Sequence, residues 1–180
     1  YAVVLAGDMP LIRGESIKSL LASARGGDFS CMMLTGYVQN PKGYGRILRD
    51  EIGSVVGIVE EKDATDFQRS ICEVNVSVYC FRTADLLFAL GKLAPANAQG
   101  EYYITDCVKI LHDAGKKVGG QPVADLTDCM GVNDRVQLAE AEALMRRRIN
   151  ERHMRAGVTL IDPAQTYISP ESEIGADTVI

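Results

Sequence analysis

Asp8 ends an apolar run near the start of the chain, where residues 2–10 read AVVLAGDMP. The run is short, contains β-branched residues and is followed at once by a glycine and a proline, which is typical of an interior strand of a parallel sheet. In open α/β sheets the ligand crevice lies outside the carboxyl ends of the strands, so Asp8 is a candidate binding residue. Asp also favours turns and caps, because its carboxylate accepts backbone N–H groups, and this run alone leaves both interpretations open.

Three more candidate positions lie in strand-like segments further along the chain. In GYGRI, Gly45 would let the backbone approach a ligand closely, although a loop turn before a strand has the same signature. In GIVEEKDA, the Glu60 carboxylate could accept paired hydroxyl groups of a sugar, or it could lie exposed at a strand end. Asn75 interrupts EVNVSVY, where a buried amide needs either a ligand or a hydrogen bond that braces a loop.

Asn133 is the last candidate, and it stands just before a long helical segment in the run MGVNDR. Its first interpretation is a helix N-cap. Beside an acidic residue, its carbonyl oxygen could also bind Mg²⁺, which prefers hard oxygen ligands and keeps several waters. The sequence around Asn133 leaves both roles open.

Strand-like and helix-like segments alternate along the chain and would position these residues. Strands are predicted within 2–10 and at 29–34, 45–48, 54–60, 73–81 and 116–123. Helices are predicted at 14–25, 84–93, 100–115 and 133–155. The third and fourth strand segments flank a polar turn and predict a hairpin. The alternation predicts an α/β fold, namely a three-layer domain with a mostly parallel sheet that carries an antiparallel insertion.

The sequence changes character after the helical segment that ends at Arg155. Isoleucines recur at Ile168, Ile174 and Ile180, and this period fits the hexapeptide repeat of a β-helix, in which each short strand turns an aliphatic residue inward. Two copies cannot form a stable solenoid alone, because each coil needs neighbours to bury its face. We therefore expect the natural chain to continue past Ile180. Tyr1 leads straight into a strand, so we also expect the domain to begin before it.

Composition and charge argue against several classes of function. The chain has 180 residues, is 47% hydrophobic and carries a formal net charge of −5, which gives no support for binding nucleic acid or an anionic membrane. We recognise no signal peptide and no apolar stretch of ~18 residues that could span a membrane. The five cysteines show no CxxC spacing, so they do not suggest a zinc site. Scattered in apolar segments, they predict reduced thiols in a cytoplasmic protein.

In their order along the chain, these motifs closely resemble one family, the bacterial N-acetylglucosamine-1-phosphate uridyltransferases. Members are bifunctional enzymes whose second half is a left-handed β-helix acetyltransferase. The resemblance lies in AGDMPLI, GYGRI, GIVEEKDAT, EVNVSVY, AQGEYYITD and GVNDR, then in AGVTLIDP and the hexapeptides. It implies a Rossmann-like nucleotidyltransferase domain over residues 1–132 that lacks its N-terminal part, a linker helix over 133–157 and the first coils of the left-handed β-helix over 158–180.

The resemblance also implies roles for individual residues. It implies that Asp8 and Asn133 hold a catalytic Mg²⁺. Residues in five motifs are implied to bind the UDP-sugar: Ala6, Gly7, Asp8, Gly45, Glu60, Asn75 and Asn133. The family's Gly-rich phosphate loop and uracil-reading residues would lie before Tyr1, and the acetyl-coenzyme A site would lie beyond Ile180. Without the phosphate loop, we expect the 180 residues alone to be inactive.

The implied reaction joins UTP and N-acetylglucosamine-1-phosphate to give UDP-N-acetylglucosamine and pyrophosphate. Full-length family members also acetylate glucosamine-1-phosphate with acetyl-coenzyme A, and their β-helix implies a homotrimer. Neither nucleic acid nor a membrane is an implied partner. Val76 and Ser77 stand where many relatives carry a small residue and Gly, which is a departure near the implied sugar pocket. Two alternatives stay open: a nucleotidyltransferase for another sugar phosphate or base, and a non-catalytic β-helix scaffold.

Overall fold

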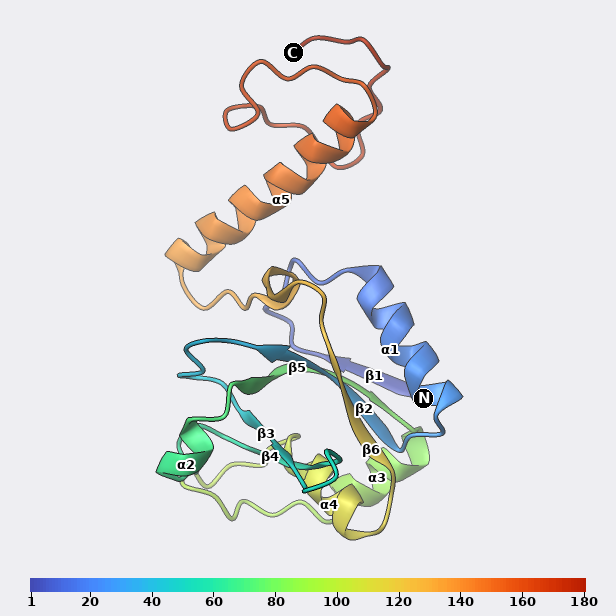
Figure 1. Ribbon diagram of the computed structural model, residues 1–180, viewed down its shortest axis with the longest axis vertical. Helices are drawn as coiled ribbons and strands as arrows, with labels where there is room; N and C mark the ends of the chain where they lie inside the picture. The colour runs from blue at the N-terminus through green and yellow to red at the C-terminus, as the bar shows by residue number, and fades with distance from the viewer. The chain divides into compact units, whose positions relative to one another are not determined.

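The computed structural model describes all 180 residues, which form two compact units (Figure 1). The first unit comprises Tyr1–Gly7 and Ile12–Cys129, and the second comprises Asp8–Leu11 and Met130–Ile180. The short segment after β1 therefore belongs with the C-terminal part of the chain, which the sequence does not predict. The first domain is predicted to end at residue 132, and the first unit ends at Cys129.

A six-stranded sheet forms the centre of the first unit. Its strands are β1 (Ala2–Leu5), β2 (Cys31–Tyr37), β3 (Arg46–Arg49), β4 (Val55–Val59), β5 (Glu73–Phe81) and β6 (Val118–Pro122). They lie in the order β4-β3-β5-β2-β6, and β1 also pairs with β5. The long strand β5 is thus the axis of the sheet, because it pairs with β1, β2 and β3. Each strand overlaps a predicted strand segment.

The prediction of a mostly parallel sheet is wrong. Only β2 and β6 pair in parallel, whereas β1, β2 and β3 run antiparallel to β5, and β3 and β4 form the predicted hairpin. The prediction took short runs of buried apolar residues as a sign of parallel pairing. Burial on both faces requires only helices on both sides of a sheet, so it does not determine strand direction.

β1 also differs from the interior strand that its sequence predicts. It pairs with β5 alone, and Val3 and Leu5 remain 37% and 42% exposed. The apolar side chains of a strand indicate that the strand can be buried. They do not tell which other segment of the protein covers it.

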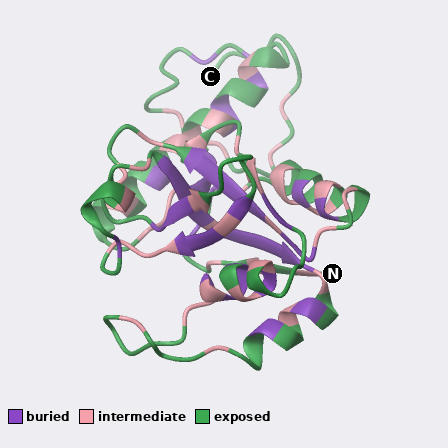
Figure 2. Ribbon diagram, turned by 60° about the horizontal axis from the view of Figure 1, so that its bottom comes forward, coloured by how far each residue is buried: buried purple, intermediate pink, exposed green.

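Helices cover both faces of the sheet, which gives the first unit three layers (Figure 1). They are α1 (Gly14–Gly26), α2 (Asp66–Arg69), α3 (Thr83–Leu90) and α4 (Asp106–Asp113), with a short 3-10 turn at Leu126–Cys129. α1 packs on β2 and β5, whereas α3 and α4 lie on the opposite face and pack on each other. The purple strands in Figure 2 show that burial is concentrated in the sheet between these layers.

Four of the five cysteines are buried, and none forms a disulfide. Cys31 of β2 and Cys107 of α4 belong to the same hydrophobic cluster, between the sheet and the layer of α3 and α4. Burial raises the pKa of Cys31 and raises that of Cys107 to about 11, so both are protonated thiols near neutral pH. They are packing residues of the core.

β5 carries a bulge at Ser77. Met33 of β2 pairs with Tyr79, but two residues later along β2 the partner is Asn75, so extra residues of β5 protrude between these pairs. Ser77 takes a φ of +57°, in the left-handed region that favours glycine. Its N–H donates to Asn75 Oδ1 at 3.1 Å. The departure noted at Ser77 therefore lies where the backbone is strained for any side chain with a Cβ.

Substituting Ser77 tests this strain. We expect Ser77→Gly either to raise the free energy of unfolding or to lower it by less than ~1 kcal/mol. Relief of the strained left-handed conformation offsets the backbone entropy that glycine loses on folding. Ser77→Val should destabilise by about 2 kcal/mol, because a β-branched residue is disfavoured at positive φ. Urea denaturation measures both, with Ser54→Val before β4 as the control. An equal effect of Val at both positions would contradict the prediction.

The second unit is built on α5 (Arg135–Arg155). Its N-cap is Asp134, whose carboxylate accepts the Gln137 N–H at 2.8 Å. The sequence leaves Asn133 open between this role and that of a Mg²⁺ ligand, and the N-cap interpretation is wrong by one residue, because Asn and Asp cap about equally well and a pattern cannot choose between neighbours. Although α5 is long, it is highly charged, and no helix in the structure combines the length and apolarity needed to cross a membrane.

After α5 the chain folds back on itself as an irregular coil. Thr159 and Val179 form a parallel bridge between the two ends of this coil. The buried Asn150 of α5 holds the coil by donating its Nδ2 hydrogens to the carbonyl oxygens of Pro163 at 2.7 Å and Thr166 at 2.9 Å.

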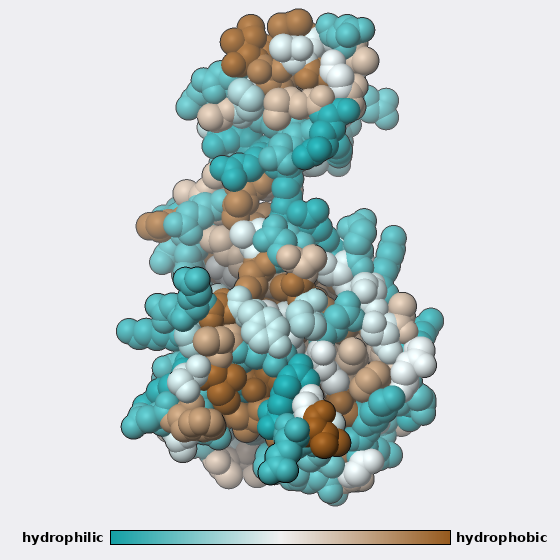
Figure 3. Space-filling view, in the orientation of Figure 1, coloured by the Kyte–Doolittle hydropathy of each residue, from teal (hydrophilic) through white to brown (hydrophobic).

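Apolar side chains lie exposed where the two ends of this coil meet. Ile161, Val179 and Ile180 are 79%, 62% and 45% exposed. An apolar surface is visible at this end of the second unit (Figure 3).

Candidate functional site

Asp8 and Asn133 come together in the second unit. The Val132 N–H donates to the carbonyl oxygen of Asp8 at 2.9 Å and ties the segment after β1 to the segment before α5. A Cβ placed on Gly131 would lie 3.4 Å from Asp8 Oδ2 and 3.9 Å from Asn133 Nδ2. The two polar side chains therefore border the same space beside Gly131.

Neither of these side chains is used elsewhere in the structure. Both residues are exposed, and only their backbones are engaged: the Asp8 carbonyl oxygen accepts the Val132 N–H, and the Asn133 N–H donates to Gln137 Oε1 at 2.7 Å. The Asn133 carboxamide is free to turn because Asp134 supplies the cap. No group of three His, Cys, Asp or Glu side chains gathers anywhere to hold a metal. One carboxylate and one amide oxygen fit Mg²⁺, which takes few protein ligands and completes its shell with waters or phosphates.

A second cluster of predicted residues lies in the first unit. The Gly45 carbonyl oxygen accepts the Asn75 N–H at 2.8 Å. A Cβ on Gly45 would lie 3.2 Å from Glu60 Oε2 and 3.0 Å from Ile58 Cγ2, so a side chain there would crowd the carboxylate. The structure thus brings Gly45, Glu60 and Asn75 into one neighbourhood, and the close approach that glycine allows here is toward Glu60.

Two hydroxyl groups complete this cluster. Thr105, which is 5% exposed, donates its hydroxyl to Glu60 Oε1 at 3.0 Å. Asn75 Nδ2 donates to the Tyr79 hydroxyl oxygen at 2.7 Å. Sequence reasoning missed both residues. Thr105 reads there as part of a helix, and Tyr79 as an ordinary strand aromatic. Thr105 lies 45 residues from Glu60, and the contact between Asn75 and Tyr79 spans the bulge of β5, which no local pattern reports.

Asn75 shows the bracing bonds that were one of its two predicted roles. Its Oδ1 accepts the Ser77 N–H, and one Nδ2 hydrogen goes to Tyr79. The residue is 5% exposed, and one amide hydrogen remains. A bracing role and a binding role therefore do not exclude each other at this position.

Arg46 holds the loop that carries Gly45. Arg46 is only 1% exposed, and its guanidinium donates to Glu61 Oε2 at 2.6 Å and to the carbonyl oxygen of Tyr44. The Gly43 N–H donates to the same Glu61 oxygen at 3.2 Å. The Arg46 hydrogen bond, followed by that of Gly43, lowers the pKa of Glu61 and so favours its charged form. These hydrogen bonds tie the loop to Glu61, in the segment that follows β4.

Ala6 and Gly7 lie in the loop between β1 and Asp8. Ala6 is half-buried and Gly7 is exposed, and a Cβ on Gly7 would meet nothing within 4 Å. Both residues lie in the predicted loop at the strand end. No side-chain contact in the structure indicates a role for either of them.

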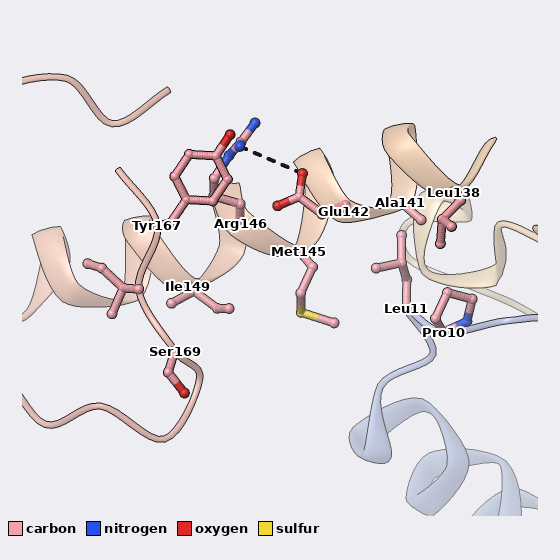
Figure 4. Close-up of a pocket in the computed structure, with 11 residues that line it drawn as sticks. Pro10, Leu11, Leu138, Ala141, Glu142, Met145, Arg146, Ile149, Tyr167 and Ser169 are labelled. Carbon is pink, nitrogen blue, oxygen red and sulfur yellow. Dashed lines mark ion pairs between the residues drawn. The ribbon is translucent and has the colours of Figure 1, made fainter. Parts of the chain in front are cut away.

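A cavity of about 410 Å³ lies beside α5 in the second unit (Figure 4). Its walls are largely apolar and include Pro10, Leu11, Ala141, Met145 and Ile149. Arg146 lies 4.3 Å over the Tyr167 ring and 3.6 Å from Glu142, so the charges at this end are paired. The lining includes neither Asp8 nor Asn133, and such walls do not suit a sugar phosphate.

Comparison with known proteins identifies close relatives. No protein-family model matches the chain. It is 50% identical over all 180 residues to the bifunctional protein GlmU of Acetivibrio thermocellus, and 49% identical to those of Lactococcus lactis over 176 residues and Streptococcus suis over 178 residues. These matches cover 98–100% of this chain but only 38–39% of the relatives. The chain thus spans about two fifths of the length of the proteins it resembles.

A solved structure shares the fold. It is that of a protein from Bacillus anthracis assigned as a glucose-1-phosphate thymidylyltransferase, with a TM-score of 0.57 over 79% of this chain and 53% of that one. At 19% sequence identity, the likeness shows a common fold.

The adjacent residues Asn133 and Asp134 provide a matched test of the site. We expect Asp134→Ala to lower the free energy of unfolding of the second unit by about 1 kcal/mol through the lost cap. Asn133→Ala should change it by less than ~0.5 kcal/mol, because the side chain is exposed and makes no bond. Hydrogen exchange of the first amides of α5 measures both effects. A larger loss for Asn133→Ala would show that Asn133 has a structural role.

Proposed function

We propose that this chain is part of a GlmU-like sugar-1-phosphate nucleotidyltransferase that makes UDP-N-acetylglucosamine and pyrophosphate from UTP and N-acetylglucosamine-1-phosphate. The observation that carries the proposal is the convergence of Asp8 and Asn133, with free side chains, beside Gly131. Similarity to GlmU proteins over the whole chain supports the substrate class, and the fold shared with a nucleotidyltransferase agrees with it.

In the proposed reaction, an oxygen of the sugar's 1-phosphate attacks the α-phosphorus of UTP, and pyrophosphate leaves. Such transfers depend on positioning and on neutralising charge rather than on a nucleophile of the protein. Asp8 and Asn133 would hold Mg²⁺, which when bound supplies positive charge that offsets the repulsion between two polyanions.

The cluster in the first unit would bind the sugar. Glu60 Oε2 and one Nδ2 hydrogen of Asn75 have no hydrogen-bond partner in the structure, so one acceptor and one donor are available for the hydroxyl and acetamido groups of a ligand. The Thr105 hydroxyl holds the Glu60 carboxylate by its hydrogen bond. Gly45 has no side chain and so leaves room for that carboxylate. We propose that Ala6 and Gly7 contact the same ligand through their backbone.

The second unit would continue into the acetyltransferase part of such a protein. We propose that residues 158–180 are the first coil of a left-handed β-helix, which the parallel bridge between Thr159 and Val179 supports. The exposed Ile161 and Ile180 are side chains that a following coil would bury. Acetyl-coenzyme A, glucosamine-1-phosphate and trimer formation would belong to that part, in a cytoplasmic protein.

Removing the proposed metal ligand tests the function. In the longest natural polypeptide that contains this chain, Asp8→Asn should lower kcat for uridyl transfer by about 100-fold or more, because one charge on the ion's ligand set is lost. Thermal unfolding should stay unchanged, since Asp8 is exposed and makes no side-chain bond.

The control is Asp66→Asn, a change at a side chain that is fully exposed on α2 and should leave kcat unaltered. Pyrophosphate release measures the rate with UTP, CTP and dTTP, and with N-acetylglucosamine-1-phosphate and glucose-1-phosphate. Wild-type turnover by Asp8→Asn would contradict the metal role. A preference for another base or sugar phosphate would replace the proposed substrates, and no transfer by the wild type would favour a scaffold.

A further inference from the structure

The Asn75 carboxamide is held in a single orientation. The Ser77 N–H, which can only donate, points at one end of the amide at 3.1 Å, so that end must be the Oδ1 oxygen. The other end is then Nδ2, which donates to the Tyr79 hydroxyl oxygen at 2.7 Å. The usual ambiguity between the two ends of an Asn side chain is therefore resolved by the left-handed turn at Ser77 and by Tyr79.

Tyr79 is itself fixed from several sides. It is 1% exposed, and its ring stacks on Phe81 with ring centres 5.7 Å apart. Burial raises its pKa well above the ordinary value, and the nearby Glu60 charge raises it further, against a lowering by the Asn75 hydrogen bond. The hydroxyl therefore remains neutral near neutral pH and stays an acceptor for Asn75. It is the one polar atom on an otherwise apolar side chain, and it points at a proposed binding residue.

This arrangement determines what Asn75 has left to offer. One Nδ2 hydrogen is committed to Tyr79, Oδ1 is engaged by Ser77, and the second Nδ2 hydrogen has no partner. The group presented is thus a donor of fixed direction, and it selects for an acceptor on the ligand. An N-acetylated sugar carries a carbonyl acceptor at the carbon where an amino sugar carries only a nitrogen.

We propose that Tyr79 is a positioning residue for sugar recognition, which locks the Asn75 amide with its free N–H toward the ligand and so favours an acetamido sugar over the corresponding amino sugar. The inference rests on the proposed function. The inference goes beyond that function, because it assigns the choice between N-acetylglucosamine-1-phosphate and glucosamine-1-phosphate to a residue that acts only through Asn75.

Tyr79→Phe tests the inference, because it removes the hydroxyl and keeps the ring. In the longest natural polypeptide that contains this chain, we expect KM for N-acetylglucosamine-1-phosphate to rise about tenfold, while kcat and KM for UTP stay within about twofold. The ratio of kcat/KM for N-acetylglucosamine-1-phosphate to that for glucosamine-1-phosphate should fall by a similar factor. Tyr167→Phe is the matched control, since it removes the hydroxyl of a 70% exposed tyrosine.

A double-mutant cycle separates positioning from a general structural effect. If Tyr79 acts through Asn75, then Tyr79→Phe should leave KM unchanged in an Asn75→Ala background. Additive effects on KM, or equal losses with both sugar phosphates, would overturn the inference. An unchanged KM in the single Tyr79→Phe variant would also overturn it while leaving the proposed function intact.

Two further results complete the design. If the wild type transfers no uridyl group to either sugar phosphate, the proposed function itself fails. If Tyr79→Phe lowers the melting temperature strongly, Asn75→Asp provides the second variant, because it keeps the acceptor for the Ser77 N–H and lacks the amide hydrogens that Tyr79 directs. A folded Asn75→Asp protein with unaltered sugar preference would count against the inference.

Discussion

The hydrogen bond from the Val132 N–H to the Asp8 carbonyl oxygen is the contact on which the functional interpretation depends. It joins two segments that are far apart along the chain and places both in the second unit. A carboxylate and a carboxamide are thereby brought to one space beside Gly131. Because Asp134 caps α5, the Asn133 side chain has no structural duty that competes with ligand binding.

The two clusters of candidate residues differ in how firmly their side chains are held. Glu60 and Asn75 are bonded to Thr105, Tyr79 and the bulge of β5 before any ligand arrives. Sugar recognition needs such fixed orientations, because each hydroxyl or carbonyl must meet a matching donor or acceptor. Asp8 and Asn133 are exposed and unbonded, which suits ligands of an ion that sets its own bond lengths and keeps waters in its shell.

The sequence predicts all six strands and every α-helix except the four-residue α2, because these elements have local signatures. The strand over 73–81 and the helix that begins at Gly14 fall where hydrophobic period and turn residues place them. Apart from the hairpin of β3 and β4, strand direction could not be predicted, since the antiparallel pairing of β5 with β1 and β2 depends on contacts between distant segments. The cap of α5 was placed one residue too early, because Asn and Asp have similar preferences for the N-cap position.

The same limit applies to the candidate site. The motifs around Asp8, Gly45, Glu60, Asn75 and Asn133 are visible in the sequence, but their grouping into two clusters is a property of the fold. Thr105 and Tyr79 could not be predicted, because each acts by a single hydroxyl contact that leaves no pattern in the residues around it.

The most direct measurement of the metal site is paramagnetic broadening by Mn²⁺, a substitute for Mg²⁺, in the NMR spectrum of the 180-residue chain. Convergence of Asp8 and Asn133 on one ion predicts that the amide signals of Gly131 and Val132 broaden first, that excess Mg²⁺ restores them and that Asp8→Asn abolishes the effect. Broadening centred elsewhere, or unchanged signals at these two residues, would contradict the shared metal site.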